Sequence, residues 1–411
     1  MKKGTDIVIV ASARTPFDVF GGAMRDISGV DLSAMVIKEL LHRSRLAPNQ
    51  IDEVNLGQCI LSEAALQTDI TARQALLKAG LPDTTLSNNF DRACCSSTTA
   101  LQQCFKNITL GEAEVSIAIG VDNMSRAPYL LPPKYRWDGG RIGEVTLKDP
   151  VFSLGYDNYG VLAIDAGEVA LEYDITREMQ DAFALKSQLN YQIAKEKGIF
   201  KEEIFPVEVP QKRGKPPIVV SEDMQPRPQT TIESLTALKT VYKSPTVTAG
   251  NAPGLNAGAS GLVVTTREKA EQLDLPSIAT IRSVVSIARN PREIAVAPAP
   301  AIQKALSTAG VELKDIKRIE INEAFAAVPL VSTKVLAQQQ TKGTGWEEEA
   351  ERLRRITNVN GGAIAIGHPV GATGLRIVMT LANELKRSGG GLGVMAICGG
   401  LAQGDSIVIE V

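Results

Sequence analysis

One histidine lies in a stretch of glycine and small apolar residues that suits a catalytic base. The chain has only two histidines, and His368 stands between Gly367 and Pro369 in the run 358–374. Glycine permits close backbone approach, and proline suits the first turn of a helix. Apolar residues then recur at helical spacing over 375–382. We therefore expect His368 at a turn between a strand and the start of a helix, where the helix N-terminus stabilises negative charge.

Two adjacent cysteines at another expected helix start could supply a nucleophile. Cys94 and Cys95 precede an apolar pattern of helical spacing over 101–108. The dipole of a helix and its free N–H groups favour a thiolate, and a lowered pKa makes a thiol nucleophilic. A third cysteine, Cys398, follows a strand pattern and precedes two glycines. Each cysteine taken alone is more often a packed core residue, so the case for chemistry rests on their occurrence together with His368.

Strand and helix patterns alternate around these residues, which favours an α/β fold. The clearest patterns are strands at 6–11, 54–59, 115–120, 261–265 and 316–321 and helices at about 32–40 and 69–78. A second α/β half begins at about Ser277, and its strand at 316–321 ends at Asn322. The charge-rich segment 343–355 has a helical pattern that is typical of a solvated surface.

A unit of helix, turn and strand occurs twice, each time with a reactive side chain where the helix is expected to begin. In the first unit Cys94 precedes the helix, and the strand ends near Gly120. In the second unit His368 precedes the helix, a glycine turn follows at 389–391, and the strand ends at Cys398. A repeated supersecondary unit indicates internal duplication, although the reactive side chains themselves differ.

The segment 125–243 differs in character from both halves. It contains ten prolines together with frequent aromatic and charged residues. This composition predicts an inserted, loop-rich lobe, and loops of this kind often shape substrate sites. One long helix is expected within it, over about 165–197.

Size and composition exclude several classes of protein. The chain of 411 residues can bury a large core, and its net charge of −2 gives no footprint for nucleic acid or an anionic membrane. The N-terminal apolar run is too short for a signal peptide, and no stretch is long enough to span a membrane. The five cysteines form an odd, scattered set without metal-ligand spacing. This pattern favours a reducing, cytoplasmic compartment and no bound metal.

The combination of these residues resembles the thiolase family. Cys94 before a helix, Asn322 after a strand, His368 in its glycine-rich turn and Cys398 before two glycines together match the family. Further matching landmarks are Ser12-Ala-Arg-Thr-Pro16, Asn123-Met-Ser-Arg-Ala-Pro128, 178–188, Thr248-Ala-Gly-Asn251, Asn322-Glu-Ala-Phe-Ala326 and the run from Asn360 to Pro369. The chain is therefore similar to thiolases over nearly its whole length.

The resemblance implies a thiolase-like five-layered αβαβα core built from two duplicated halves, with a loop domain inserted in the first half. The implied first half covers residues 1–124 and 246–272, and the second covers 273–411. The inserted loop domain, 125–245, would carry the lobe that binds the substrate and coenzyme A (CoA). These boundaries agree with the repeated unit and with the proline-rich segment.

The resemblance also implies a role for each candidate residue. In thiolytic cleavage, the direction of beta-oxidation, Cys94 would attack the 3-keto carbon of a 3-oxoacyl-CoA after activation by His368. Cys398 would protonate the released enolate and then deprotonate CoA, a task that suits a thiol whose pKa lies near the working pH. Asn322 would hold a water that binds the enolate oxygen beside His368, and the N–H groups of Cys94 and Gly400 would form an oxyanion hole. In reverse, the same groups run a Claisen condensation.

CoA is expected as a co-substrate, with no permanently bound cofactor. The resemblance places Arg227, Ala252 and Pro253 against it, although Arg227 could equally be a solvated residue among prolines. Pro253 replaces a serine that contacts the pantetheine in many members, and proline has no N–H to donate. Other departures from the family pattern are Val161, Leu162, Gly167 and Ala257. We therefore expect an acyl group other than acetoacetyl, which is longer, branched or aromatic.

Several alternatives stay open. Cys94 matches the family nucleophile because a small residue and then Ser96 follow it, but a direct role for the neighbouring Cys95 is not excluded. His42 has no partner motif and is expected at the surface. A decarboxylating ketoacyl synthase would usually need two histidines, or histidine and asparagine, beside its cysteine. The single plausible active-site histidine and the second cysteine before two glycines argue against it. Loss of a catalytic cysteine would instead indicate a non-catalytic acyl-CoA-binding or lipid-binding subunit, but Cys94 and Cys398 are both present.

The resemblance leaves the state of assembly open. Family members are generally homodimers or homotetramers. Some work with a small zinc-binding OB-fold partner protein. Either assembly is compatible with the sequence, which also leaves the direction of the reaction undecided.

Overall fold

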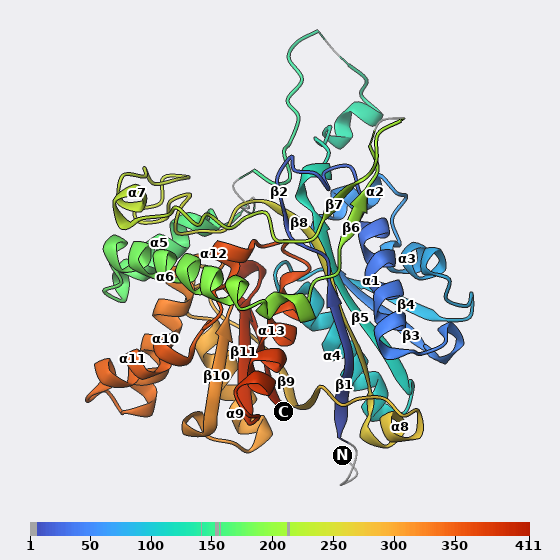
Figure 1. Ribbon diagram of the computed structural model, residues 1–411. Helices are drawn as coiled ribbons and strands as arrows, with labels where there is room; N and C mark the ends of the chain where they lie inside the picture. Colours follow the sequence, from blue (N-terminus) through green and yellow to red (C-terminus); the bar gives the residue numbers. More distant parts are fainter. Residues whose placement is uncertain (1–5, 141, 153–155, 157, 212–213) are drawn as a thin grey trace.

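A mixed sheet of ten strands runs through the molecule (Figure 1). The computed structural model describes all residues except 1–5, 141, 153–155, 157 and 212–213. The strand order is β10-β11-β12-β9-β1-β8-β5-β3-β4, and β2 pairs with β8. The strands are β1 (Ile7–Arg14), β2 (Asp18–Val19), β3 (Glu53–Gln58), β4 (Leu86–Phe90), β5 (Val115–Asn123), β8 (Asn256–Thr266), β9 (Ala279–Ala288), β10 (Ile316–Ile321), β11 (Leu392–Cys398) and β12 (Gln403–Glu410).

The two halves of this sheet repeat each other. The order β1-β8-β5-β3 in the first half corresponds to β9-β12-β11-β10 in the second. In each half the first two of these pairings are antiparallel and the third is parallel. The halves join where β1 pairs antiparallel with β9, from Ile7 opposite Ile281 to Ile9 opposite Ala279. The predicted internal duplication is therefore confirmed.

Helices complete the five layers that the family resemblance implies. The middle layer consists of α4 (Ser96–Leu110) and α13 (Thr373–Arg387), which contact each other and strands of both halves. Every residue of α13 from Thr373 to Leu385 is buried except Glu384, as a helix at the centre of a core requires. The outer layers are α1 (Gly29–Ser44) and α3 (Thr71–Ala79) on the first half and α9 (Pro298–Ala309) with α10 (Ala327–Gln340) on the second (Figure 1).

Two glycines allow the segments beside the candidate catalytic residues to lie directly on strands. On β3, a side chain at Gly57 would come within 2.3 Å of the backbone of Ser96. On β5, a side chain at Gly120 would come within 2.4 Å of the carbonyl oxygen of Gly371. Only glycine avoids these collisions. The turn that carries Cys94 and the turn that carries His368 can therefore both lie close to the sheet, and so close to each other.

The stretch that carries His368 differs from its prediction. It follows a short helix, α12 (Ala363–Ile366), instead of a strand, and the next helix begins at Thr373 instead of Pro369. The physical reason is that backbone N–H groups of this stretch do not form hydrogen bonds to a neighbouring strand. Buried carboxylates accept them instead: Glu323 from Ile364 and Asp122 from Gly371.

The segment inserted between β5 and β8 contains two helices where one long helix is expected. They are α5 (Leu162–Glu172) and α6 (Arg177–Glu196). Asp174 has a positive φ of 54°, which ends the first helix, and the Thr176 hydroxyl caps the second by accepting a hydrogen bond from the Met179 N–H. The described residues of this segment also form the strands β6 (Val207–Val209) and β7 (Ile218–Val220) and the short helix α7 (Ile232–Thr236).

A buried ion-pair cluster holds the inserted segment on the core. Arg14, at the end of β1, donates hydrogen bonds to Glu203 at 3.0 Å and to both carboxylate oxygens of Asp223 at 2.7 and 2.9 Å. All three side chains are fully buried. Because removal of Arg14 would leave two buried carboxylates without a partner, this cluster ties the inserted segment to the end of β1.

Three further observations concern the described residues only. No helix among them is long and apolar enough to cross a membrane. In this part of the chain no group of three or more His, Cys, Asp or Glu side chains is arranged to hold a metal ion. The second histidine, His42, is exposed on α1, as expected.

Candidate active site

The reactive residues of the two halves meet in the middle of the molecule. The Cys94 Sγ lies 3.2 Å from the His368 Nε2, although 274 positions separate the two residues in the sequence. Both are buried, with 9% and 6% of their surfaces exposed. The contact forms because Cys94 precedes α4, His368 precedes α13, and these two helices pack side by side. A thiol and an imidazole at this separation can exchange a proton directly.

A hydrogen-bond chain determines which nitrogen of His368 carries the proton. The Thr373 hydroxyl lies 2.6 Å from the His368 Nδ1 and donates its own hydrogen to the Pro369 carbonyl oxygen at 2.9 Å. A hydroxyl has one hydrogen, so Thr373 must accept from an Nδ1–H group. The Nε2 of the neutral ring is therefore free to accept the proton of the Cys94 thiol.

Burial keeps both reactive groups neutral. It lowers the pKa of His368 to about 3, with a smaller contribution from the positive charge of Arg376. Burial also raises the pKa of the Cys94 thiol well above its ordinary value, and the neighbouring Cys398 adds to this. The expectation that the helix dipole makes Cys94 a thiolate is therefore wrong. Because α4 begins only at Ser96, His368 must take the proton as the thiol attacks.

Asn322 is the second side chain, after Cys94, that lies close to the Nε2 of His368. It follows β10, and its backbone N–H donates to the Ala396 carbonyl oxygen at 3.0 Å, which holds it against β11. Its Nδ2 lies 3.4 Å from the His368 Nε2. Its Oδ1 is buried and accepts no hydrogen bond from the described residues. Asn322 can therefore orient the imidazole and still accept a hydrogen bond from a ligand or water.

Cys398 and Gly400 lie at the end of β11, close to the Cys94 turn. Cys398 is fully buried, and burial raises the pKa of its thiol to about 12. The expectation that the pKa of Cys398 lies near the working pH is therefore wrong. Before the reaction begins, Cys398 is a protonated, neutral thiol. The backbone N–H of Gly400 makes only a long hydrogen bond, 3.5 Å, to the Arg92 carbonyl oxygen, so it can donate to a ligand.

Cys95 has a structural environment. Its side chain is fully buried, and its thiol donates to the Ile397 carbonyl oxygen at 3.6 Å. A side chain at Gly399 would come within 2.7 Å of the Cys95 Sγ, so this thiol packs against the backbone of the β11 end. This geometry favours Cys94 as the nucleophile because only its thiol contacts His368.

Two residues that position the Cys94 and His368 turns are not predicted from the sequence. Asp405 on β12 accepts hydrogen bonds from the Arg92 guanidinium at 3.0 and 3.1 Å and from the Thr98 hydroxyl at 2.6 Å, which fixes the turn around Cys94. Asn256 on β8 accepts from the His368 backbone N–H at 2.8 Å. No local signal points to either residue because each lies more than a hundred positions from its partner turn.

Two of the residues expected to bind CoA line one surface pocket. The pocket has a volume of about 350 Å³ and includes Arg227 and Ala252. Its other lining residues are Gln188, Gln225, Gln229, Thr230, Ser234, Leu235, Leu238, Ala249, Gly250 and Ile364. Arg227 is exposed, and its guanidinium forms no ion pair within the described part of the chain, so it can bind a phosphate. Pro253 follows Ala252 in the chain but is not among the lining residues.

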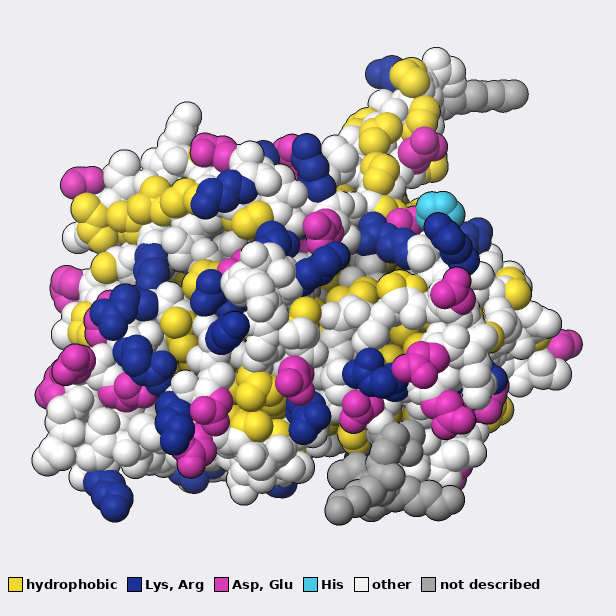
Figure 2. All heavy atoms as spheres, turned by 60° about the horizontal axis from the view of Figure 1, so that its bottom comes forward, with side chains coloured by type: hydrophobic (Ala, Val, Ile, Leu, Met, Phe, Trp, Pro, Cys, Tyr) yellow, Lys and Arg dark blue, Asp and Glu magenta, His cyan; other side chains and the backbone are white. Residues whose placement is uncertain are grey.

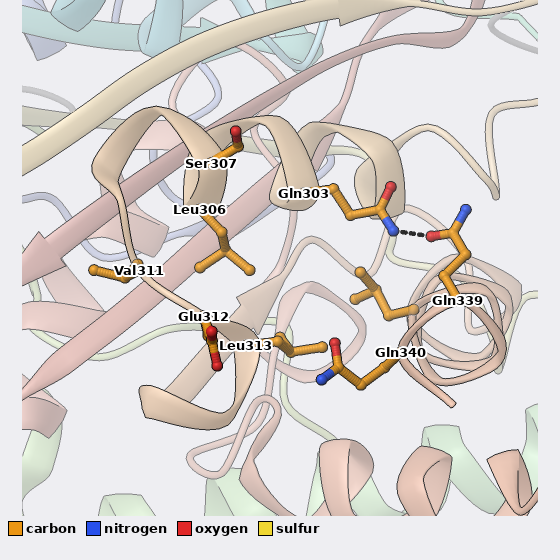
Figure 3. A pocket seen from close by; sticks show the side chains of 9 residues that line it. Gln303, Leu306, Ser307, Val311, Glu312, Leu313, Gln339 and Gln340 are labelled. Atoms are coloured by element: carbon orange, nitrogen blue, oxygen red, sulfur yellow. Dashed lines mark hydrogen bonds between the residues drawn. The ribbon is translucent and has the colours of Figure 1, made fainter. Parts of the chain in front are cut away.

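A larger depression, of about 450 Å³, lies between α9 and α10 and contains none of the expected site residues. Figure 3 shows Gln303 and Gln339 hydrogen-bonded across it. Its remaining lining residues are Leu306, Ser307, Val311, Glu312, Leu313, Leu336 and Gln340. Because no titratable group other than Glu312 lines it, this depression has no evident chemistry.

Comparisons with known proteins agree with this geometry. Residues 7–268 match the model of the thiolase N-terminal domain, and residues 275–411 match that of the thiolase C-terminal domain. The acetyl-CoA acetyltransferase of Cupriavidus necator is 40% identical over 411 residues, which cover 99% of each protein. The crystal structure of the Bacillus anthracis acetyl-CoA acetyltransferase has a TM-score of 0.91 at 36% identity, covering 99% of this chain and 98% of that one. Human mitochondrial 3-ketoacyl-CoA thiolase in complex with CoA has a TM-score of 0.86 at 33% identity, with the same coverage.

Proposed function

Because the chain belongs to the thiolase family and is an acyltransferase that acts on acyl-CoA, we propose that it cleaves a 3-oxoacyl-CoA through an acyl group carried on Cys94. The observation that carries this assignment is the 3.2 Å contact between the Cys94 Sγ and the unprotonated Nε2 of His368. A neutral thiol and a neutral imidazole are the reactants that such a nucleophilic step needs.

In the first half of the reaction, His368 takes the thiol proton while the Cys94 sulfur attacks the C3 carbonyl carbon. The oxyanion accepts hydrogen bonds from the N–H groups of Cys94 and Gly400. The bond between C2 and C3 then breaks, which leaves the acyl group on Cys94 and releases the enolate of acetyl-CoA. The imidazolium Nε2–H and a water held by Asn322 donate to the enolate oxygen, and the Cys398 thiol donates its proton to C2.

In the second half, CoA removes the acyl group. The Cys398 thiolate takes the proton of the CoA thiol, and the CoA sulfur attacks the thioester on Cys94. The Cys94 thiolate leaves and recovers its proton from His368. The high pKa of Cys398 supports both of its tasks, because its thiol stays protonated at rest and its thiolate is a strong base.

CoA would bind in the pocket that Arg227 and Ala252 line. The exposed guanidinium of Arg227 would bind a phosphate group at the pocket mouth. The lining residue Ile364 belongs to α12, which precedes the His368 turn, so the pocket adjoins the segment that carries the base. The inserted segment 125–245 would form this substrate lobe because it supplies most of the lining residues.

The acyl group is proposed to be longer, branched or aromatic. Val161 and Leu162, where short-chain family members often carry histidine and methionine, are partly buried against the apolar core of the second half. A side chain at Gly167 would come within 2.4 Å of the Ser244 Oγ, so the acid that is usual in the family has no room. Pro253 also removes a hydrogen-bonding side chain. These changes make the surroundings of the acyl group less polar.

The test is a thiolysis assay with acetoacetyl-CoA and with long, branched and aromatic 3-oxoacyl-CoA esters. We expect one of the larger esters to be cleaved faster than acetoacetyl-CoA, and Cys94→Ala to abolish cleavage. Cys95→Ala is the matched control and should remain active. Faster cleavage of acetoacetyl-CoA would refute the acyl-group assignment, and cleavage by Cys94→Ala would refute the role of Cys94.

The chain is further proposed to assemble into dimers or tetramers. The edge strand β4 pairs only with β3, and its Leu86 is 68% exposed, so a second copy could extend the sheet there. Figure 2 shows hydrophobic side chains exposed on the surface of the molecule. Exposed large hydrophobic residues of the inserted segment include Tyr129, Leu131, Trp137 and Ile142. Light scattering should give a mass of two or four chains, and a monomer at micromolar concentration would refute this.

The state of the thiols supports a proposed cytoplasmic location. All five cysteines are free. Since both Cys94 and Cys398 must react as thiols, a reducing compartment would preserve activity. Fractionation of cells that produce the protein would test this location, and recovery from an oxidising compartment would refute it.

A further inference from the structure

Tyr156 places a hydroxyl group next to the turn that carries Gly400. A side chain at Gly400 would come within 2.5 Å of the Tyr156 Oη and within 3.1 Å of the Ala93 Cβ. Because a carbon–carbon bond is about 1.5 Å long, the hydroxyl oxygen lies no more than about 4 Å from the Gly400 Cα. Ala93 directly precedes Cys94, so the hydroxyl lies on the same side of Gly400 as the Cys94 turn. Cys94 is also among the groups that influence the pKa of Tyr156.

The Tyr156 hydroxyl is without a partner in the described part of the chain. It forms no hydrogen bond with any group among the described residues, and its side chain is partly buried. Because no described protein group occupies the hydroxyl, it is free to donate a hydrogen bond to a ligand beside Gly400. Burial raises the pKa of Tyr156, and Cys94, Cys59 and Asp91 nearby contribute, so the phenol keeps its proton. It can therefore act as a donor throughout the reaction.

We propose that the hydroxyl of Tyr156 contacts the substrate and donates a hydrogen bond to the carbonyl oxygen of the acyl group that reacts with Cys94. This inference rests on the proposed function, because the oxygen it describes exists only when an acyl group is attacked by, or attached to, Cys94. The carbonyl oxygen would lie between the N–H groups of Cys94 and Gly400, and the adjacent hydroxyl would supply a third donor. The bond strengthens as negative charge develops on that oxygen.

Alternatively, the Tyr156 side chain could line the acyl-binding site without donating a hydrogen bond. The aromatic ring would then limit the size of the acyl group, and the hydroxyl would be dispensable. The two roles separate in Tyr156→Phe, which keeps the ring and removes only the hydroxyl. Tyr159 offers a matched control because it lies in the same segment, its backbone N–H donates to the Tyr156 carbonyl oxygen at 3.0 Å, and its side chain is 53% exposed.

The experiment measures two reactions of Cys94 in wild type, Tyr156→Phe and Tyr159→Phe. The first is thiolysis of the best 3-oxoacyl-CoA ester, which passes through an oxyanion. The second is alkylation by iodoacetamide, which needs the same thiol and imidazole but forms no oxyanion. We expect Tyr156→Phe to lower kcat about tenfold, the effect of one hydrogen bond of ordinary net strength, with KM for CoA unchanged. Alkylation should be unchanged, and Tyr159→Phe should behave as wild type.

Each other outcome overturns the inference. Equal kcat values for wild type and Tyr156→Phe would leave the ring as a wall and exclude the donor. Parallel losses in kcat and in alkylation would show that Tyr156 acts by holding Cys94 in place. An equal loss in Tyr159→Phe would show a general disturbance of the segment. Wild-type protein that cleaves no ester would refute the proposed function itself, and this inference with it.

Discussion

Replacement of Thr373 by valine tests the proton arrangement in the active site. Valine has nearly the shape of threonine but lacks the hydroxyl that lies 2.6 Å from the His368 Nδ1 and 2.9 Å from the Pro369 carbonyl oxygen. The position is fully buried, so water does not simply replace the hydroxyl. The Nδ1–H group of the productive tautomer would lose its acceptor. The proton would then be more stable on Nε2, where it blocks acceptance of the Cys94 proton.

The size of the effect follows from the cost of that lost partner. A buried donor without an acceptor costs about 1–3 kcal/mol. Because each 1.4 kcal/mol changes a rate tenfold, the rate at which Cys94 is acylated should fall by about 5-fold to 150-fold. Loss of the hydrogen bond to Pro369 should lower the free energy of unfolding by a further ~1 kcal/mol.

The assay is the pre-steady-state burst of Cys94 acylation, with urea unfolding measured in parallel. Thr373→Ser keeps the hydroxyl and should retain most of the burst rate. Thr380→Val, about two turns further along α13, is the matched control because its buried hydroxyl has no hydrogen-bond partner among the described residues. It should acylate as wild type and unfold at equal or higher urea. An unchanged burst rate in Thr373→Val would refute the assignment of the proton to Nδ1.

Three further predictions concern the surroundings of the site. Asp405→Ala leaves the guanidinium of Arg92 without its carboxylate, so the free energy of unfolding by urea should fall by about 3 kcal/mol, and a negligible change would show that this ion pair does not hold the Cys94 turn. Arg227→Ala should raise KM for CoA about tenfold in steady-state kinetics without changing kcat, whereas an unchanged KM would remove Arg227 from the CoA site. For His368 the folded pKa of about 3 lies below the ordinary value of 6.5, so the unfolded chain binds the proton first and stability from this group is lost as pH falls from 6.5 towards 3. His368→Gln should therefore lose less unfolding free energy than wild type on acidification through this range, and equal losses would contradict a buried neutral imidazole.

Local patterns in the sequence are sufficient to locate the reactive residues and most elements that carry them. The helix after Cys94, the strand that ends at Cys398 and the strand before Asn322 all occur where periodicity places them. The repeated unit also predicts the duplicated sheet, because each half must bury its helix against the same order of strands. Glycine and apolar spacing are properties of neighbouring residues, so they can be read without coordinates.

Predictions failed where a distant group competes with a local preference. The stretch before His368 forms α12 because Glu323 accepts one of its N–H groups, and the helix after it starts late because Asp122 binds the Gly371 N–H. The inserted helix divides for a local reason instead, because Asp174 has a positive φ and the Thr176 hydroxyl caps a new helix start. Glu323 and Asp122 are brought to the His368 stretch by tertiary packing, so the sequence of that stretch gives no indication of them.

Residue type and spacing were therefore enough to indicate the family resemblance, the two-half architecture and the candidate residues Cys94, His368 and Cys398. The charge states, by contrast, depend on the folded chain. Burial reverses the direction expected for the pKa of Cys94, and this depends on how much protein surrounds the thiol. Tertiary contacts also decided the tautomer of His368, through a hydroxyl that must donate elsewhere. Proton positions depend on distances of a few ångströms between groups, and only the folded chain sets those distances.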